Sequence, residues 1–401
     1  MENLYDTKWQ TAGGESWEDR YRQDRYETSH WLFSRLDFTK VLRAGRAIDA
    51  GLTYNLDHTD EWWHTEQWSN EAWVVDPDQS RSFLIQNHEA TAYAIYRDSY
   101  DKLSYSVGAS LQWDRIAYEK SGGALTARDY IQPFGNISVA YAINPQRGTN
   151  INLDVSCYIS ALPTSDQLST YEKRVSENVY YVGNENLDLP TGYRTQLTYT
   201  LRGAWRFSYS FGLQKDGIYD LSWVDPERPE VVWQSPVNGT RTYRHDVAVS
   251  WNQSVTDWLR CNVSCEGGWI RDWYGEYNCN DFRYSVSVNL LFVLPKNATI
   301  SAWGFYESGQ QRIGSRMNDA LLIGVSADKR IGKRFTIALS ATFRMWNRVM
   351  TNYQLDGSYV MSTAILVAPL EGLRVTLSYD FLNRNPKPIR KVETKSLDNA
   401  W

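Results

Sequence analysis

Cysteine and long apolar runs are scarce in this sequence of 401 residues. The four cysteines are too few and too irregularly spaced for a disulfide framework; they are Cys157, Cys261, Cys265 and Cys279. Cys265 and Cys279 are compatible either with one bridge across a loop or with free thiols. No stretch approaches the roughly 18 uninterrupted apolar residues that a membrane helix needs. A helical membrane protein is therefore excluded.

Motifs for catalysis, cofactors and nucleic acid are also missing. The chain has five histidines and contains no Gly-x-Ser-x-Gly elbow, no His-Glu-x-x-His pair and no phosphate-binding glycine loop. A net charge of −5 gives no electrostatic reason to expect a nucleic-acid partner. We therefore expect no enzyme, no cofactor, no resident metal and no nucleic-acid partner.

A signal peptide is not visible at the start of the chain. Residues 2–30 are charged and polar, without the apolar segment that a secretory signal requires. Two interpretations stay open: the protein is cytosolic, or its natural N-terminus lies upstream and this chain is a fragment.

Aromatic residues, by contrast, are abundant, with 18 Trp and 27 Tyr, and both side chains suit the interface between membrane and water. Residues 193–213 show how they are arranged. Each arm alternates between an apolar and a polar side, and the apolar set of the second arm is Phe207, Tyr209, Phe211 and Leu213. Because side chains alternate along a strand, this pattern predicts a hairpin that turns at residues 202–206.

The same layout recurs along the chain, separated by eight short turn signals rich in Gly, Pro and Asn. They lie at residues 41–46, 100–102, 143–149, 202–206, 254–257, 293–298, 329–334 and 368–372. The intervals leave room for two long strands and a longer polar loop, so we expect about 16 strands. Short turns at one end and long loops at the other are typical of transmembrane barrels. A soluble sandwich has shorter strands, and a propeller has a repeated blade signature.

Charge placement agrees with a lipid-facing surface. A charged residue facing lipid at mid-depth costs roughly 2–4 kcal/mol, and the apolar faces of the clearest strands carry none. Arg194, Arg283, Arg344 and Asp380 all fall on the opposite, lumen-facing set. The predicted fold is therefore all-β, an antiparallel transmembrane β-barrel. Its expected organisation is a polar N-terminal segment at 1–29, a barrel at 30–384 and a basic tail at 385–401.

Residues 158–190 carry a more specific signal. A Pro-containing loop and an aromatic stretch precede the element Gly183-Asn184-x-Asn186-Leu187 with Pro190, and the next strand begins at once. Here the chain resembles the Bacteroidetes-type outer membrane β-barrel family, relatives of the TonB-dependent receptors. Those motif residues are expected to be structural. The strand rhythm of residues 30–384 extends the resemblance over most of the chain.

The resemblance implies a cell outer membrane protein that takes up a scarce solute, such as a siderophore, cobalamin, a peptide or a glycan. Such receptors have a 22-stranded barrel with a plugged lumen. We find no plug pattern here and about six strands too few, and interpret the chain as a truncated C-terminal barrel portion. Implied partners are outer-membrane lipid, the barrel assembly machinery, a small-molecule or glycan ligand and, only through the missing plug, the TonB complex. An open sheet would leave unpaired edges in lipid, so it must close or fail to insert.

Two aromatic stretches are candidate ligand-binding loops. The first, residues 58–80, holds Trp62, Trp63, Trp68 and Trp73; the second, residues 269–277, holds Trp269 and Trp273. Exposed indoles offer flat surfaces to sugars or aromatic ligands, and long loops carry function. The alternatives are membrane-interface tryptophans on strands that run further than the pattern shows, or a metal site at His58, His64 and Glu66. For the whole chain, a soluble all-β carbohydrate-binding protein and a non-transporting barrel remnant stay open.

Overall fold

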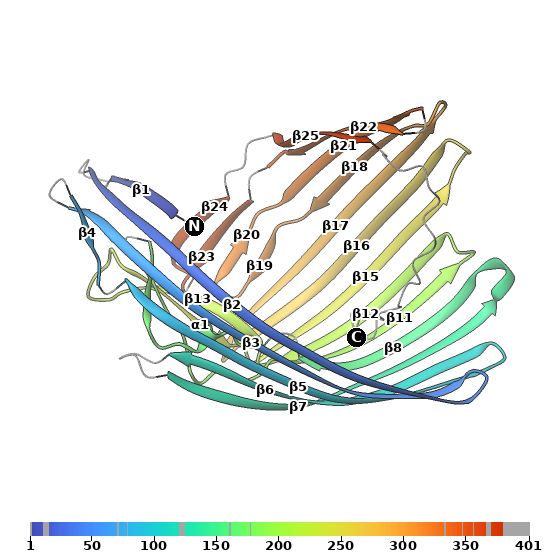
Figure 1. Ribbon diagram of the computed structural model, residues 1–401, viewed down its shortest axis with the longest axis horizontal. Helices are drawn as coiled ribbons and strands as arrows, with labels where there is room; N and C mark the ends of the chain where they lie inside the picture. The colour runs from blue at the N-terminus through green and yellow to red at the C-terminus, as the bar shows by residue number, and fades with distance from the viewer. Residues whose placement is uncertain are drawn as a thin grey trace.

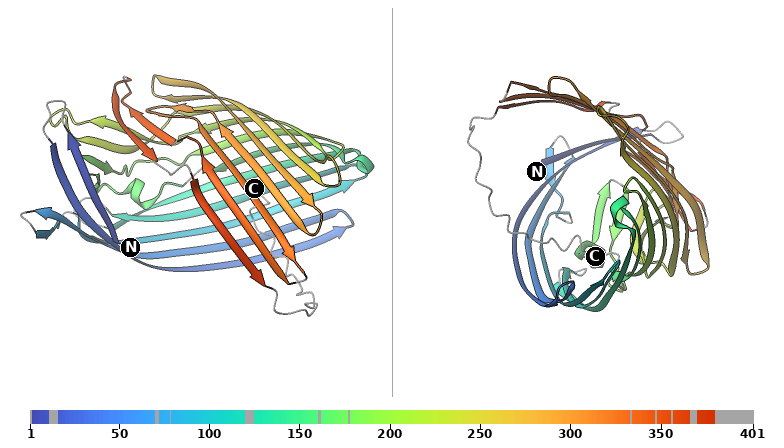
Figure 2. Two further views of the ribbon diagram at one scale, coloured as in Figure 1. Left: turned by 90° about the horizontal axis from the view of Figure 1, so that it is seen from above. Right: turned by 90° about the vertical axis from the view of Figure 1, so that its right-hand side faces the viewer.

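A computed structural model describes residues 2–379, apart from 11–15, 70–71, 78, 120–124, 160–161, 177, 333, 347, 356 and 366–369. Long strands run side by side across the molecule (Figure 1). The sheet that they form curls around a central hollow (Figure 2). Within the described part of the chain, no helix is long and apolar enough to cross a membrane.

The main sheet has 17 strands, of which β4 (Ala72–Val75) only extends the end of β3. The other 16 pair antiparallel in chain order. They are β1 (Glu2–Gln10), β2 (Ser16–Arg43), β3 (Arg46–Ser69), β5 (Arg81–Tyr100), β6 (Leu103–Glu119), β7 (Leu125–Asn144), β8 (Thr149–Ile159), β11 (Thr191–Leu201), β12 (Trp205–Lys215), β15 (Arg241–Ser254), β16 (Leu259–Tyr274), β17 (Tyr277–Leu294), β18 (Ala298–Glu307), β21 (Ala320–Ile331), β22 (Phe335–Arg344) and β25 (Leu370–Tyr379). The predicted antiparallel all-β fold with about 16 strands is confirmed.

Seven of the eight predicted short turns join neighbouring strands at one end of this sheet, at the right of Figure 1. Gly45, with φ of +80°, occupies the first of them. The prediction of an eighth turn at residues 368–372 is wrong, because Gly372 lies inside β25, which pairs with β22 after a long connection. Gly and Pro there follow a long loop at the opposite end, and composition alone does not distinguish the two ends of a sheet.

The two faces of the sheet have opposite character. Leu153, Leu197 and Tyr209 lie side by side in register and are 41%, 42% and 44% exposed. On the opposite face, Thr198 and Ser210 are only 3% and 6% exposed. A soluble sheet buries its apolar face against a second layer, whereas here the apolar face points outward and the polar face lines the hollow. This arrangement suits lipid outside and water within.

Aromatic side chains form two outward-facing girdles. At the short-turn end the Trp205 ring lies 6.1 Å from Phe207 and 5.8 Å from Trp251. Towards the other end, the ring of His245 lies 5.0 Å from Phe211 and 5.5 Å from Trp269. The apolar band between two such girdles marks the membrane-spanning part of the sheet.

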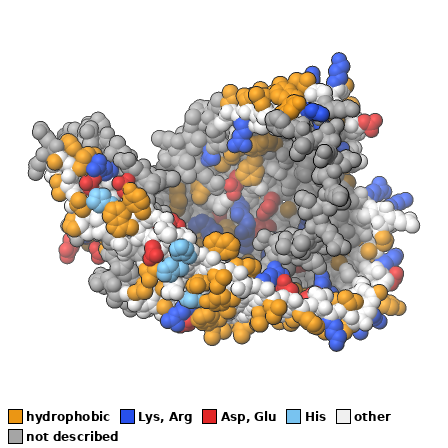
Figure 3. Space-filling model, viewed as in Figure 1, with side chains coloured by type: hydrophobic (Ala, Val, Ile, Leu, Met, Phe, Trp, Pro, Cys, Tyr) orange, Lys and Arg blue, Asp and Glu red, His pale blue; other side chains and the backbone are white. Residues whose placement is uncertain are grey.

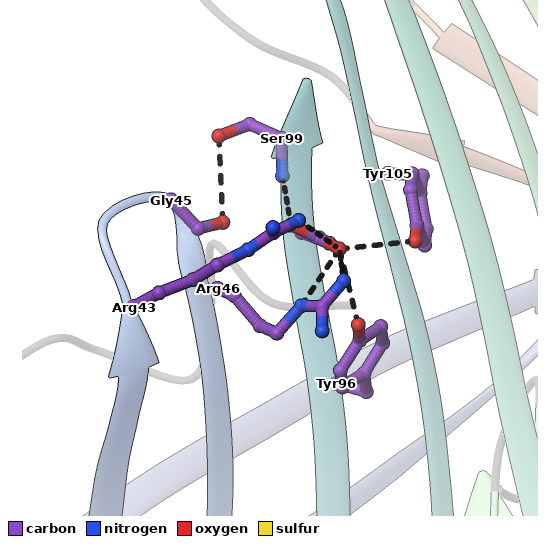
Figure 4. A network of polar contacts seen from close by, with 7 residues as sticks. Arg43, Gly45, Arg46, Tyr96, Ser99 and Tyr105 are labelled. Atoms are coloured by element: carbon purple, nitrogen blue, oxygen red, sulfur yellow. Dashed lines mark hydrogen bonds and ion pairs between the residues drawn. The ribbon is translucent and has the colours of Figure 1, made fainter.

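Asp98 ties the strands of the first hairpins together at the short-turn end (Figure 4). Its carboxylate, 4% exposed, accepts hydrogen bonds from Arg46 Nη2 at 2.7 Å and from Arg46 Nε at 2.9 Å. The hydroxyls of Tyr96 and Tyr105 donate to the same carboxylate at 3.2 and 3.3 Å. Arg43 Nη2 approaches it at 3.5 Å. This buried anion neutralises arginines that lie on the outward side of the sheet.

The described strands leave the sheet open. In the part of the chain that the structure describes, no pairing joins β25 to β1 or β2, and no separate plug domain is present. Strand β2 begins at Ser16, inside the segment predicted to precede the barrel. The predicted C-terminal tail at 385–401 lies outside the described residues.

We expect Leu197→Arg to block membrane assembly, whereas Gln196→Arg is tolerated. Leu197 faces outward, so an arginine there costs roughly 2–4 kcal/mol at mid-depth, whereas Gln196 faces the hollow, where water solvates the charge. The measurement is heat-modifiable gel migration of the outer-membrane fraction. Equal assembly of both variants would contradict the assignment of the two faces.

Candidate functional site

The long connections fold back on one another at the end opposite the short turns. Strands β9 (Glu172–Ser176), β10 (Val179–Val182), β13 (Ile218–Val224) and β14 (Val232–Asn238) form a small sheet in the order β13-β14-β10-β9. Because β10 and β14 pair in parallel, the loop after β8 is joined to the loop after β12. A second small sheet contains β19 (Gln310–Arg312), β20 (Ser315–Met317), β23 (Arg348–Tyr353) and β24 (Tyr359–Ile365).

The predicted family motif fastens the first of these loops beneath the short helix α1 (Ser165–Leu168). A capping box between Thr164 and Gln167 begins the helix. Gly183 lies so close under it that a Cβ would overlap the carbonyl oxygen of Ser169 and lie 2.7 Å from that of Asp166. Asn184 N then donates to the Gln167 carbonyl at 2.7 Å. Any side chain at position 183 must displace the helix.

The next motif residues pack against the inner wall of the sheet. Leu187 and Leu168 are fully buried and form one apolar cluster with Ile116, Tyr118 and Tyr130 of β6 and β7. The Tyr130 hydroxyl donates to the Leu187 carbonyl at 3.2 Å. The loop of residues 162–190 is therefore attached to the lumen-facing side of the wall and narrows the mouth.

A buried polar cluster connects the wall to two further loops. Asp272 of β16 is 1% exposed and accepts from Arg312 Nε of β19 at 2.6 Å. Thr242 Oγ1 and the Tyr219 hydroxyl donate to the other carboxylate oxygen at 2.7 and 3.1 Å. Arg312 Nη2 also donates to the Tyr219 hydroxyl at 3.2 Å. The cluster of Asp272, Arg312, Tyr219 and Thr242 joins strands β15 and β16 to β13 and β19.

The environment of this cluster raises the pKa of both loop side chains. Burial is the largest cause of the raised pKa of Tyr219, and the charge of Asp272 adds to it. Burial acts to lower the pKa of Arg312, but the Asp272 charge and the contacts with Tyr219 and Asp272 raise it above its usual value. Tyr219 therefore stays neutral and Arg312 stays charged at physiological pH.

The hollow below the loops is lined with charges of both signs, as Figure 3 shows. On β15 and β17, Asp246 accepts from Arg244 Nε at 2.8 Å and from Arg283 Nη2 at 3.4 Å. Glu266 lies 4.0 Å from Arg283. These side chains are paired with one another while remaining partly accessible, so the inner wall offers fixed donors and acceptors to a polar occupant of the hollow.

The prediction that Trp62, Trp63, Trp68 and Trp73 lie in a loop is wrong. The first three lie on β3 and the last on β4, where Trp68 pairs with Trp73. The strand continues past the apolar band, where neither face meets lipid, so apolar and charged residues occur on both sides and the period of two is lost. A role for these tryptophans in ligand binding stays a prediction.

These four tryptophans divide between the two faces of the strand. The Trp62 ring stacks on His64 at 5.3 Å and lies 5.5 Å from Tyr26. Trp63, on the inner face, donates to Glu61 and is covered by Lys173 Nζ, 4.0 Å from its ring centroid. The indole of Trp63 is therefore occupied by the chain's own cation.

Trp269 and Trp273 also lie on a strand rather than in a loop, near the end of β16. Both point outward, away from the hollow: Trp269 lies opposite Phe282, and Trp273 opposite Arg241. This placement matches the alternative of interface tryptophans on extended strands. The loop prediction failed for the same reason as on β3.

The remaining sequence alternatives are narrowed by geometry. His58 Nε2 lies 3.5 Å from Asp60, and His64 Nε2 lies 3.6 Å from Glu66, but no group of three potential metal ligands occurs among the described residues. All four cysteines are free. Cys265 pairs with Val286 and Cys279 with Asp272, seven register positions apart, so the structure favours the free-thiol alternative.

Comparison with known proteins identifies the fold. A family model described as "Outer membrane protein beta-barrel family" matches residues 1–364, which confirms the resemblance inferred from residues 158–190. A search of curated proteins finds no match.

Solved structures share the architecture at low sequence identity. The copper transporter OprC has a TM-score of 0.59 and 10% identity, with 87% of this chain and 55% of that one covered. The pyoverdine outer membrane receptor FpvA from Pseudomonas aeruginosa PAO1 has a TM-score of 0.57 and 11% identity, with coverages of 95% and 58%. The chain thus spans a little over half the length of these proteins, which are a transporter and a receptor rather than enzymes.

We expect Gly183→Ala to loosen the loop of residues 162–190. The added methyl group must displace the carbonyl groups of α1, and overpacking of this kind costs about 1–3 kcal/mol. The measurement is the rate of limited proteolysis in intact membranes. Gly304→Ala on β18 is the control, because a Cβ there meets no atom within 4 Å; equal rates for the two variants would contradict the packing assigned to Gly183.

We expect Arg312→Ala to destabilise the mouth by roughly 2–3 kcal/mol, since it leaves Asp272 buried without its cation; fully buried pairs lose 3–5 kcal/mol, and Arg312 is one-third exposed. Thermal unfolding of the purified protein measures this loss. Asp272→Asn added to Arg312→Ala recovers part of it, and Arg316→Ala in the same loop is the neutral control. A double variant less stable than Arg312→Ala alone would refute the pairing.

Proposed function

Because this chain belongs to the outer membrane protein beta-barrel family, we propose that it forms the barrel portion of a TonB-dependent receptor that takes up a scarce solute. The observation that carries the proposal is the placement of residues 162–190. An extracellular loop that only covered a pore could stay outside the sheet. This one is attached to the inner wall through Leu187 and Tyr130, which narrows the entrance to a charged hollow.

The polar lining supports a solute that enters the hollow. Arg244, Asp246, Arg283 and Glu266 present donors and acceptors in fixed positions, and ligand sites combine such groups with apolar surface. The mouth supplies that surface through the aromatic residues of β3, β4 and β10. A small polar molecule or a glycan suits this combination better than an apolar solute does.

Energy coupling requires a plug that contacts TonB, and the described residues contain no such domain. The proposed TonB partnership is therefore indirect and depends on a plug supplied with this barrel. The solute class follows the neighbours only in outline, since OprC is a copper transporter and FpvA a pyoverdine receptor. Siderophores, cobalamin, peptides and glycans are the candidates.

The outward apolar face disfavours the soluble carbohydrate-binding alternative. Leu52, Leu111, Leu373 and Val375 are all more than half exposed, and a monomeric soluble protein rarely leaves so large an apolar surface in water. The non-transporting remnant shares this face and is separated from a receptor only by an uptake measurement.

We expect deletion of the gene from its host to abolish growth on one scarce solute at limiting concentration. The panel comprises ferric siderophores, cobalamin, peptides and glycans. Uptake of that solute should fall to the level of a TonB-deficient strain, because both changes interrupt one energised route. Complementation with the intact gene restores uptake.

The Leu197→Arg variant, which is expected not to assemble, serves as the negative complementation control. Uptake of every solute that is unaffected by the deletion would favour the non-transporting remnant. Uptake that needs the gene but proceeds without TonB would contradict energised transport and indicate a passive pore.

A further inference from the structure

Two arginines enclose a tryptophan on the outer surface of the sheet, near the long-loop end. Arg241 begins β15, and Arg271 and Trp273 lie near the end of β16. The guanidinium carbons of Arg241 and Arg271 lie 4.8 and 4.5 Å from the centroid of the Trp273 ring. Stacking of this kind holds both guanidinium groups in fixed positions.

The strand register places this group on the outward side. Ile270 and Asp272 are 5% and 1% exposed against the inner loops, so the alternate residues Arg271 and Trp273 point away from the hollow. Arg241 lies directly opposite Trp273. Lys215 of β12 lies opposite Arg241 and extends the positive surface by one strand.

The height of the group coincides with the membrane surface. Trp269, which belongs to the outward aromatic girdle with His245, precedes Arg271 and Trp273 by two and four residues. At about 3.3 Å per residue, these residues lie roughly 7 and 13 Å further along the strand, and less in height because barrel strands are tilted. Aromatic girdles lie at the interface with water, so the two arginines lie at the level of the lipid head groups.

These arginines differ from the others described above because they lack a counter-charge. Within the described residues, no carboxylate comes within ion-pairing distance of Arg241 or Arg271, and Arg271 Nε is buried without a hydrogen-bond partner. At the short-turn end, by contrast, Asp98 neutralises Arg46. In the hollow, Asp246 neutralises Arg244 and Arg283.

We propose that Arg241, Arg271 and Trp273 form a binding site for the anionic phosphate head group of a lipid in the outer leaflet. Guanidinium groups bind phosphate through paired, charge-assisted hydrogen bonds, and an indole occupies the head-group level. The long-loop end faces the cell exterior in barrels of this type, which assigns the leaflet. The site depends on membrane insertion and is independent of the proposed solute uptake.

Native mass spectrometry of the purified chain in neutral detergent tests the site, with phosphatidylglycerol and phosphatidylcholine titrated separately. Wild-type protein is expected to bind phosphatidylglycerol more tightly. Each arginine near an anionic surface contributes about a five-fold gain in affinity, so Arg241→Gln with Arg271→Gln should weaken that binding about 25-fold. The lysine pair, Arg241→Lys with Arg271→Lys, keeps the charge and should retain most of the affinity.

The matched control is Arg260→Gln, on the same strand but facing the hollow, which should leave lipid binding unchanged. Equal affinity of the wild type for both lipids would overturn the proposal, as would an equal loss in Arg260→Gln. Displacement of the lipid by inorganic phosphate would assign the site to the free ion instead. If the glutamine pair does not fold, wild-type protein decides: added KCl must weaken binding of phosphatidylglycerol and leave phosphatidylcholine unaffected.

Discussion

Backbone hydrogen bonding is the constraint on which this structure depends. Inside a bilayer no water is available to the peptide groups, so each strand must pair with its neighbour over the whole membrane-spanning length. The antiparallel ladder from β2 to β25 meets that requirement between its members. Tight turns such as that at Gly45 keep one end short. With the backbone satisfied in the sheet, the side chains are left to serve lipid on one face and water on the other.

Beyond the apolar band the constraint disappears, and packing takes its place. The long connections pair among themselves into two small sheets and then attach to the wall at a few points, notably the apolar contact of Leu187 with Tyr130 and the buried pair of Asp272 and Arg312. Both attachments lie on the lumen side, so the loops narrow the entrance rather than extend away from it. The shape of the mouth thus depends on a small number of buried contacts.

Arginines show how each environment of the barrel handles charge. In the hollow, Arg244 and Arg283 share Asp246 and remain accessible to water. On the outward surface at the short-turn end, Arg46 is matched by Asp98 within the protein. At the long-loop end, Arg241 and Arg271 meet only an aromatic ring. A charge at a membrane surface needs a counter-charge, and where the protein does not supply one, the lipid can.

The sequence by itself determined the membrane-spanning part of this protein. Lipid on one side and water on the other impose a period of two that is readable residue by residue, so the faces at Leu197 and Gln196, seven turns and the family motif at Gly183 were all predictable. Above the band neither face is constrained, and the pattern ended before β3 did, which is why the tryptophans at 62, 63, 68 and 73 were assigned to a loop. Only the tertiary structure decided the mouth. Asp272 and Arg312 are 40 residues apart, on elements with no shared periodicity, and their pairing depends on how independent loops pack together in space.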